Sequence, residues 1–168
     1  MSVLVTACLL AVAPAVGAAE PFQARVDELI ADGFAVPLGR TRVELAASLG
    51  PPRSATVRRV QNRHEPGRTD EVHELEYDGL RVVLYRVSAT GRELLMEMSL
   101  TGERHRLKWG LGVGSTRDAV RRVLGPGVRA EPGEIDTDRY EDSERLNRVE
   151  FSFRGARVRR IDWVFWLD

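Results

Sequence analysis

The chain has 168 residues and no net charge, because 25 lysine and arginine residues balance 25 aspartate and glutamate residues. With 43% hydrophobic and 30% charged residues, its composition is typical of a globular protein and excludes a disordered or fibrous chain. The lack of excess cations argues against nucleic acid or an anionic membrane surface as the partner, since affinity for either depends on positive charge.

Residues 1–19 contain no charged side chain and are predicted to be a secretory signal peptide. Their apolar run is shorter than the roughly 20 residues needed to span a bilayer. The alternative is a buried N-terminal helix, which Pro14 would interrupt. Cys8, the single cysteine, lies in a stretch that resembles a lipobox, so lipid anchoring is a second alternative. The expected location is therefore periplasmic or secreted.

An N-terminal helix with a linker is predicted at 20–35. Apolar residues recur at helical spacing from Phe22 through Val26 to Ile30, and Gly33 ends the pattern. Two tandem repeats follow, repeat 1 at 36–104 and repeat 2 at 105–168. The predicted class is α+β, each repeat being a short helix packed on an antiparallel β-meander.

The repeats are recognised by a motif that recurs 75 residues further along the chain. The first copy runs from Gly39 to Pro51 and the second from Gly114 to Pro126, sharing Gly, Thr, Arg and a closing Leu-Gly-Pro. Each copy predicts a short helix. Thr41 with Glu44, and Ser115 with Asp118, resemble N-terminal capping boxes that are displaced by one position. Gly50 and Gly125 are expected to end the helices as left-handed C-caps.

Alternating apolar and polar residues after each helix predict antiparallel strands. The expected strands are 72–77, 80–87 and 93–101 in repeat 1, and 138–141, 148–154 and 157–166 in repeat 2. Asp78-Gly79 predicts a tight turn. The side chains expected beneath the helices are Leu80, Val82, Leu84, Leu94, Met96, Met98, Leu100, Val149, Phe151, Phe153, Ile161, Trp163 and Phe165.

The repeat resembles the SmpA/OmlA (BamE-like) family of outer-membrane assembly lipoproteins. The resemblance rests on the motif Gly-x-Thr-Arg, followed after six residues by Leu-Gly-Pro and then by hairpins with short aromatic strands. Two such units in tandem resemble the β-lactamase inhibitory protein fold. The resemblance covers about residues 36–166. It implies a helix-plus-meander fold and a function in protein binding.

Motifs for catalysis or metal binding are weak. The glycine-rich run 110–116 resembles a phosphate cradle but lacks the lysine of a P-loop, so we interpret it as a turn with an N-cap. His64, His73 and His105 are expected to be exposed, although His64 and His73 with nearby acids could be metal ligands. We therefore predict no catalytic, cofactor-binding or metal-binding residues.

Charge is distributed unevenly along the chain. Residues 53–68 hold five arginines and one glutamate, whereas residues 131–144 hold seven acids and Arg139. Three interpretations remain: two solvated loops, two loops that face each other and join the halves, or a bipolar rim for a charged protein partner.

The strand faces that point away from the helices are either ordinary solvated surface or a recognition surface. The predicted protein-binding residues are Tyr85, Glu97, Arg160, Asp162 and Trp166. The sequence thus favours an exported, non-catalytic protein-binding module of the bacterial cell envelope, scaffold- or inhibitor-like, whose partner is a protein in the periplasm or outside the cell. A membrane would be involved only if Cys8 is lipidated. The alternatives are a periplasmic enzyme or metal-dependent protein using His64 and His73, or a small-ligand carrier between the repeats.

Overall fold

The computed structural model describes residues 20–62, 64–129 and 135–167. The predicted signal peptide, Cys8 and part of the acidic segment lie outside these residues. The helices are α1 (Glu20–Asp32), α2 (Arg42–Leu49) and α3 (Arg117–Leu124), with a short 3-10 turn at Lys108–Gly110. The strands are β1 (Ser54–Gln61), β2 (Thr69–Tyr77), β3 (Leu80–Arg86), β4 (Glu93–Leu100), β5 (Val128–Arg129), β6 (Thr137–Glu141), β7 (Arg148–Arg154) and β8 (Arg157–Val164). No helix in the described part of the chain is long and apolar enough to cross a membrane.

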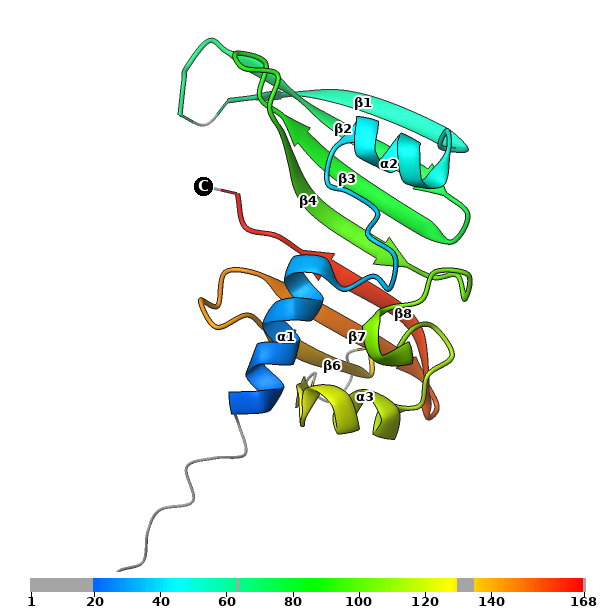
Figure 1. The fold of residues 1–168 in the computed structure, drawn as a ribbon. Helices are drawn as coiled ribbons and strands as arrows, with labels where there is room; N and C mark the ends of the chain where they lie inside the picture. The colour runs from blue at the N-terminus through cyan, green and yellow to red at the C-terminus, as the bar shows by residue number, and fades with distance from the viewer. Residues whose placement is uncertain (1–19, 63, 130–134, 168) are drawn as a thin grey trace, which may run out of the picture.

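The strands form one antiparallel, eight-stranded sheet in the order β1-β2-β3-β4-β8-β7-β6-β5. Two consecutive meanders, β1–β4 and β5–β8, are joined where β4 pairs with β8 (Figure 1). In this joint Glu97 lies opposite Val164, and Leu100 lies opposite Ile161. The fold class is therefore α+β, as predicted, and β1 and β5 form the two opposite edges of the sheet.

All three helices cover the same face of the sheet (Figure 1). Leu29 of α1, Leu45 of α2 and Val120 of α3 are fully buried and belong to one hydrophobic cluster with strand residues from both meanders. Phe34, just after α1, stacks on Trp163 of β8 with ring centroids 5.5 Å apart. Because the cluster is continuous across the β4–β8 joint, the two halves share a core.

The helix N-termini are held by threonine hydroxyls. The Thr41 hydroxyl accepts a hydrogen bond from the backbone N–H of Glu44, and the Glu44 carboxylate accepts one from the N–H of Thr41, so the predicted capping box is confirmed. The cap of α3 is Thr116, which accepts from the N–H of Ala119 at 3.2 Å. Ser115 is therefore not the cap, and the two helices begin at the same place in the motif.

The helix C-termini end at glycines with positive φ, 79° at Gly50 and 78° at Gly125. A side chain is disfavoured at such φ values, which explains the choice of glycine. The ψ values of −169° and −174° lie outside the left-handed helical region, so the predicted left-handed C-cap is wrong in detail. Each glycine N–H still donates to the carbonyl four residues earlier, at Ala46 and Arg121.

The six predicted strands are present, with bounds that differ by at most three residues. The predicted core alternation is wrong at the start of β4, because the β3–β4 register shifts between Val83 and Leu84. The shift buries Leu95 in the core and leaves Leu94 and Met96 half-buried. The strands β1 and β5 were not predicted, since neither has a buried apolar face.

Candidate functional site

The face of the sheet opposite the helices is open in the described part of the chain, and a row of mostly polar side chains crosses it. Strand registers place one residue of each strand in this row. The row consists of Ser54, Glu76, Arg81, Ser99, Asp162, Glu150, Arg139 and Val128. Glu97 and Arg160 lie beside it on β4 and β8, so three of the predicted binding residues gather at the β4–β8 joint.

Arg81 of β3 holds together three carboxylates on this open face. Its Nε donates to Glu74 Oε1 at 2.5 Å and its Nη1 to Glu97 Oε2 at 3.2 Å. Glu76 Oε1 lies 3.7 Å from the same Nε. The hydrogen bond with Arg81 lowers the pKa of Glu74, and the same bond raises the pKa of Arg81. Glu97 is therefore held in an ion pair with a fixed orientation.

Arg160 and Asp162 form a second ion pair on the joint between the meanders. The Nε of Arg160 donates to both Asp162 oxygens at 2.8 and 2.7 Å, and its Nη2 donates to Ser99 Oγ at 3.0 Å. The Ser99 hydroxyl in turn donates to Asp162 Oδ1. These contacts tie β8 to β4 and fix the direction of both charged groups.

The site prediction left out the arginines that complete this array. Arg139 and Arg148 each donate to Glu150 Oε1 at 2.9 Å, and Arg81 organises the first half of the face. Strand alternation was a sufficient signal for Arg81, which lies four residues before Tyr85 on β3. No predicted binding residue lies on β6 or β7, so alternation relative to the predicted site could not indicate Arg139 or Arg148. The pairing itself depends on register and was not visible in the sequence.

The two aromatic residues of the predicted site have different surroundings. Trp166 follows β8 and is 65% exposed, and its backbone N–H donates to Asn147 Oδ1 at 2.9 Å. The preceding Phe165 belongs to the core. Tyr85 is half-buried and its hydroxyl donates to Asp70. Trp166 thus offers exposed aromatic surface, whereas the Tyr85 hydroxyl is bonded to a buried carboxylate.

Asp70 is a buried carboxylate that organises one end of the first meander. Besides the Tyr85 bond, it accepts hydrogen bonds from the N–H and hydroxyl of Ser88, both at 2.8 Å, and from the Asn62 amide at 2.6 Å. The bond from Tyr85, followed by the one from the Ser88 N–H, holds the pKa of Asp70 well below its usual range. The acid therefore links the ends of β1, β2 and β3.

The basic and acidic segments lie at opposite edges of the sheet. The segment 53–68 contains the edge strand β1, and the described part of 131–144 contains β6, next to the opposite edge. They cannot face each other, so that interpretation is wrong. The solvated-loop interpretation is wrong for Asp138 of the acidic segment, which is fully buried and accepts from Arg121 Nε at 3.0 Å. The basic segment is solvated as expected along β1, although it forms a strand there and not a loop.

The histidines do not form a common site. His73 is 5% exposed, which contradicts the predicted exposure, and its Nε2 lies 3.0 Å from Glu71 while its Nδ1 lies 3.4 Å from Arg42 of α2. His64 is exposed in the turn between β1 and β2. The burial of His73 follows strand alternation, because His73 lies on the same face of β2 as the buried Leu75 and Tyr77. Among the described residues, no group of three His, Cys, Asp or Glu side chains is arranged to hold a metal.

The glycine-rich run before α3 forms the predicted turn with an N-cap. Gly112 and Gly114 have φ values of 158° and 89°, and Thr116 caps the helix. A carboxylate oxygen of Glu103 lies 3.3 Å from the position that a Cβ of Gly114 would occupy. An acidic side chain beside the helix N-terminus opposes binding of a phosphate there.

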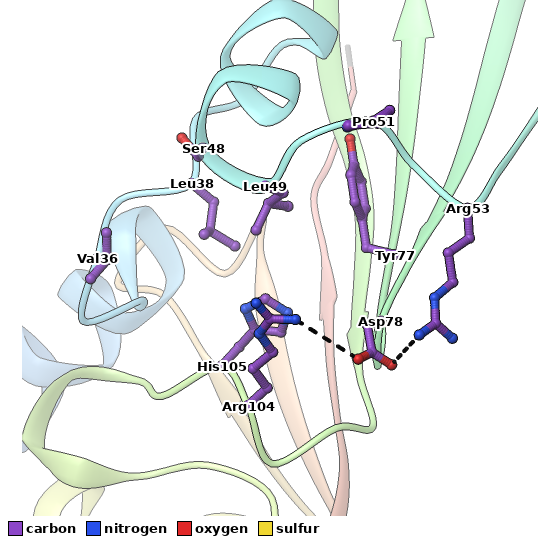
Figure 2. Close-up of a pocket in the computed structure, with 10 residues that line it drawn as sticks. All are labelled: Val36, Leu38, Ser48, Leu49, Pro51, Arg53, Tyr77, Asp78, Arg104 and His105. Atoms are coloured by element: carbon purple, nitrogen blue, oxygen red, sulfur yellow. Dashed lines mark ion pairs between the residues drawn. The ribbon is translucent and has the colours of Figure 1, made fainter.

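A surface cavity of about 430 Å³ lies between α2, the β2–β3 turn and the segment at 104–105 (Figure 2). Leu38, Leu49 and the buried ring of Tyr77 form its apolar wall. At its mouth Asp78 pairs with Arg53 at 3.1 Å and with Arg104 at 4.0 Å. The arrangement suits an apolar group with a negatively charged end.

Comparison with known proteins identifies no family. No family model matches the chain, and no curated protein matches it. A crystal structure of a DUF4309 family protein (YjgB) from Bacillus subtilis subsp. subtilis str. 168 is similar over 88% of this chain and 97% of that chain, with 14% sequence identity and a TM-score of 0.45.

Proposed function

We propose that this chain is an exported, non-catalytic protein-binding module of the bacterial cell envelope, scaffold- or inhibitor-like. In this proposal the open face of the sheet receives the partner, and Glu97, Arg160, Asp162 and Trp166 make the contacts. Tyr85, whose hydroxyl donates to Asp70, lies on the same face of β3 as Arg81. Export rests on the charge-free pattern of residues 1–19.

The observation that carries the proposal is the array of fixed ion pairs on the open face, together with an exposed tryptophan two residues beyond the end of β8. Arg160 is bound to Asp162 and Ser99, and Glu97 is bound to Arg81, so these side chains have already lost much of their rotational freedom. Ordering a long side chain on binding costs about 0.5–1.5 kcal/mol, and a pre-ordered array avoids most of that cost. Trp166 adds an aromatic surface of the kind that dominates protein interfaces.

We also propose that the two meanders with their helices are copies of one unit. Thr41 and Thr116 cap equivalent helices, and Gly50 and Gly125 end them with φ values that differ by one degree. Each helix is followed by four antiparallel strands. Duplication of this unit would explain how one sheet comes to offer a broad open face.

Site-specific photo-crosslinking tests the binding proposal. A photoreactive phenylalanine analogue replaces Trp166 in the full chain, and this variant is expressed in the native host cells. The control variant carries the same analogue at Val43 of α2, which is 79% exposed. We expect a discrete crosslinked protein from position 166 and none from position 43. With the purified partner, Trp166→Ala should weaken binding at least about tenfold, as expected for an aromatic interface anchor.

The charge array supplies the second part of the test. Glu97→Arg combined with Arg160→Glu keeps the net charge and reverses both ends of the array, and binding of the crosslinked protein should fall by at least about tenfold. No crosslink at position 166, identical products from positions 43 and 166, or full affinity in the double variant would each refute the proposal.

The cavity at Tyr77 favours a second candidate function, the binding of a small apolar anion. Its apolar wall and the two arginines at its mouth suit 1-anilinonaphthalene-8-sulfonate, which becomes fluorescent in such surroundings. Leu49→Glu should abolish the fluorescence, whereas Val43→Glu, also on α2 but exposed, should leave it unchanged. Equal fluorescence from both variants would exclude this cavity as the binding site.

A further inference from the structure

The edge strand β1 presents an unusually accessible strand of eight residues. It pairs with β2 in a single register from Ser54 to Gln61, without a bulge. All its side chains except Val60 are exposed, on both faces of the sheet. The strand contains no proline, and at about 3.4 Å per residue it extends for roughly 27 Å. Natural proteins usually shorten, bulge, cover or charge such an edge, and of these devices β1 has only the charges of Arg58 and Arg59.

The backbone of β1 has a defined set of outward-facing groups. Beyond the strand end, the N–H of Asn62 donates to the carbonyl of Arg68 at 2.9 Å, continuing the register in which Gln61 lies opposite Thr69. Hydrogen-bonded and non-hydrogen-bonded pairs alternate in an antiparallel ladder. The N–H and C=O groups of Ala55, Val57, Arg59 and Gln61 therefore face away from β2 and are available to another strand.

Charge on this edge is positive and largely unpaired. Arg58 and Arg59 are consecutive, so their side chains project from opposite faces of the sheet. Among the described residues, neither has a salt bridge within 4.0 Å, although Arg58 contributes to the low pKa of Glu74. No acidic residue lies within β1. This differs from the open face, where Arg81 and Arg160 are bound to carboxylates.

We propose that β1 binds an acidic, extended segment of another protein as a ninth strand of the sheet. Two adjacent acidic residues in that segment would meet Arg58 on one face and Arg59 on the other. A second copy of this chain is the poorer occupant. Antiparallel pairing of two β1 strands about their middle would place the arginines of both copies within one or two residues of each other, and like charges in adjacent positions destabilise a sheet.

A synthetic peptide serves as the probe. It has ten residues, alternating threonine and valine with two adjacent glutamates at the centre, and carries a fluorescein label. Its binding to the full chain is followed by fluorescence anisotropy. A control peptide carries two lysines at the centre, and a third peptide is N-methylated at every second residue along one edge, which removes the hydrogen bonds of that edge. We expect the glutamate peptide to bind at least tenfold more tightly than either control.

Variants of the chain locate the peptide on β1. Arg58→Glu with Arg59→Glu should reverse the preference toward the lysine peptide. The matched control, Arg92→Glu with Arg154→Glu, makes the same change of net charge at two exposed arginines elsewhere and should bind like the wild type. Val57→Pro removes an outward N–H but no ladder bond to β2, and should weaken peptide binding at least tenfold while the circular dichroism melt remains cooperative.

Several results would overturn the proposal. These are equal binding of the glutamate and lysine peptides, full binding of the N-methylated peptide, and a response to the control double variant equal to that of the β1 double variant. A concentration-dependent dimer in sedimentation that Val57→Pro abolishes would identify a second copy as the occupant instead. Trp166→Ala should leave peptide binding unchanged, so failure here is distinguishable from failure of the open-face proposal.

Discussion

Replacing Leu45 by alanine tests whether the two halves of the sheet unfold as one unit. Leu45 lies in α2 above the first meander and is fully buried. It belongs to the same hydrophobic cluster as Val120 of α3 and Trp163 of β8, which lie in the second half. If the shared core makes the two halves unfold cooperatively, a cavity in the first half must lower the unfolding midpoint of the second half by the same amount.

The size of the effect follows from the burial of the side chain. Truncation of a fully buried leucine to alanine costs about 2–5 kcal/mol, because apolar contacts are lost and a cavity remains. We expect about 3 kcal/mol here, since α2 lies over the first meander alone and can settle partly into the space. For a protein of this size each kcal/mol lowers Tm by about 2–4 °C, so Tm should fall by about 6–12 °C.

The positions of the tryptophans make the test specific. Trp109, Trp163 and Trp166 all lie beyond the first meander, so tryptophan fluorescence reports unfolding outside it. Far-ultraviolet circular dichroism reports both halves. In Leu45→Ala both signals should shift to the same lower midpoint. Ser48→Ala, at an exposed position of the same helix, should change stability by no more than about 0.5 kcal/mol.

A two-unit protein would give a different result. The circular dichroism transition would become biphasic, and the fluorescence midpoint would stay at the wild-type temperature. Either observation would refute the shared core. It would mean that the β4–β8 pairing and the Phe34–Trp163 contact join two domains that unfold independently.

Two further predictions concern polar contacts at the helix ends and in the sheet. Thr41→Ala and Thr116→Ala should each lower the free energy of unfolding by about 1 kcal/mol in urea denaturation. The loss should be larger at Thr41, where Glu44 also loses the hydrogen bond from the Thr41 hydroxyl. Asp70→Asn tests the buried acid. The pKa of Asp70 is lower in the folded state than in the unfolded state, where it is about 3.9, so ionised Asp70 stabilises the fold above that pH. This contribution to the free energy of unfolding is lost as the pH falls below about 3.9. The difference in Tm between wild type and Asp70→Asn should therefore shrink below about pH 4 in circular dichroism melts, and a difference independent of pH would contradict it.

The parts of the fold that could be predicted are those where local sequence and burial agree. Leu80, Val82 and Leu84 alternate with polar residues because one face of β3 is buried, and glycines end the helices where φ is positive. The strand β1 lacks this signal, since almost every side chain in it is exposed on both faces and nothing requires alternation. An edge strand of this kind is recognisable only after its partner has been placed.

The candidate site was predictable to the same extent. Strand parity correctly placed Glu97 and Asp162 on the open face, because it depends only on the period of two. The ion pairs, such as that between Arg81 and Glu97, depend on the register between strands, and this register could not be predicted from the sequence. The contact between His73 and Arg42 of α2 likewise joins residues 31 positions apart and could not be read from the sequence.

The open face and the edge strand β1 differ in whether their arginines are paired with carboxylates, and this should make their binding respond differently to salt. On the open face each arginine of the joint is already neutralised by a carboxylate, so an approaching partner meets alternating short-range charges and little long-range attraction. At β1 the charges of Arg58 and Arg59 have no salt-bridge partner in the described chain and extend an attractive field over about a Debye length, near 8 Å at physiological salt. Ionic strength should therefore weaken strand addition at β1 more than binding at the open face. This difference in salt dependence comes from the local pairing of the arginines, because the chain as a whole has no net charge that could produce it.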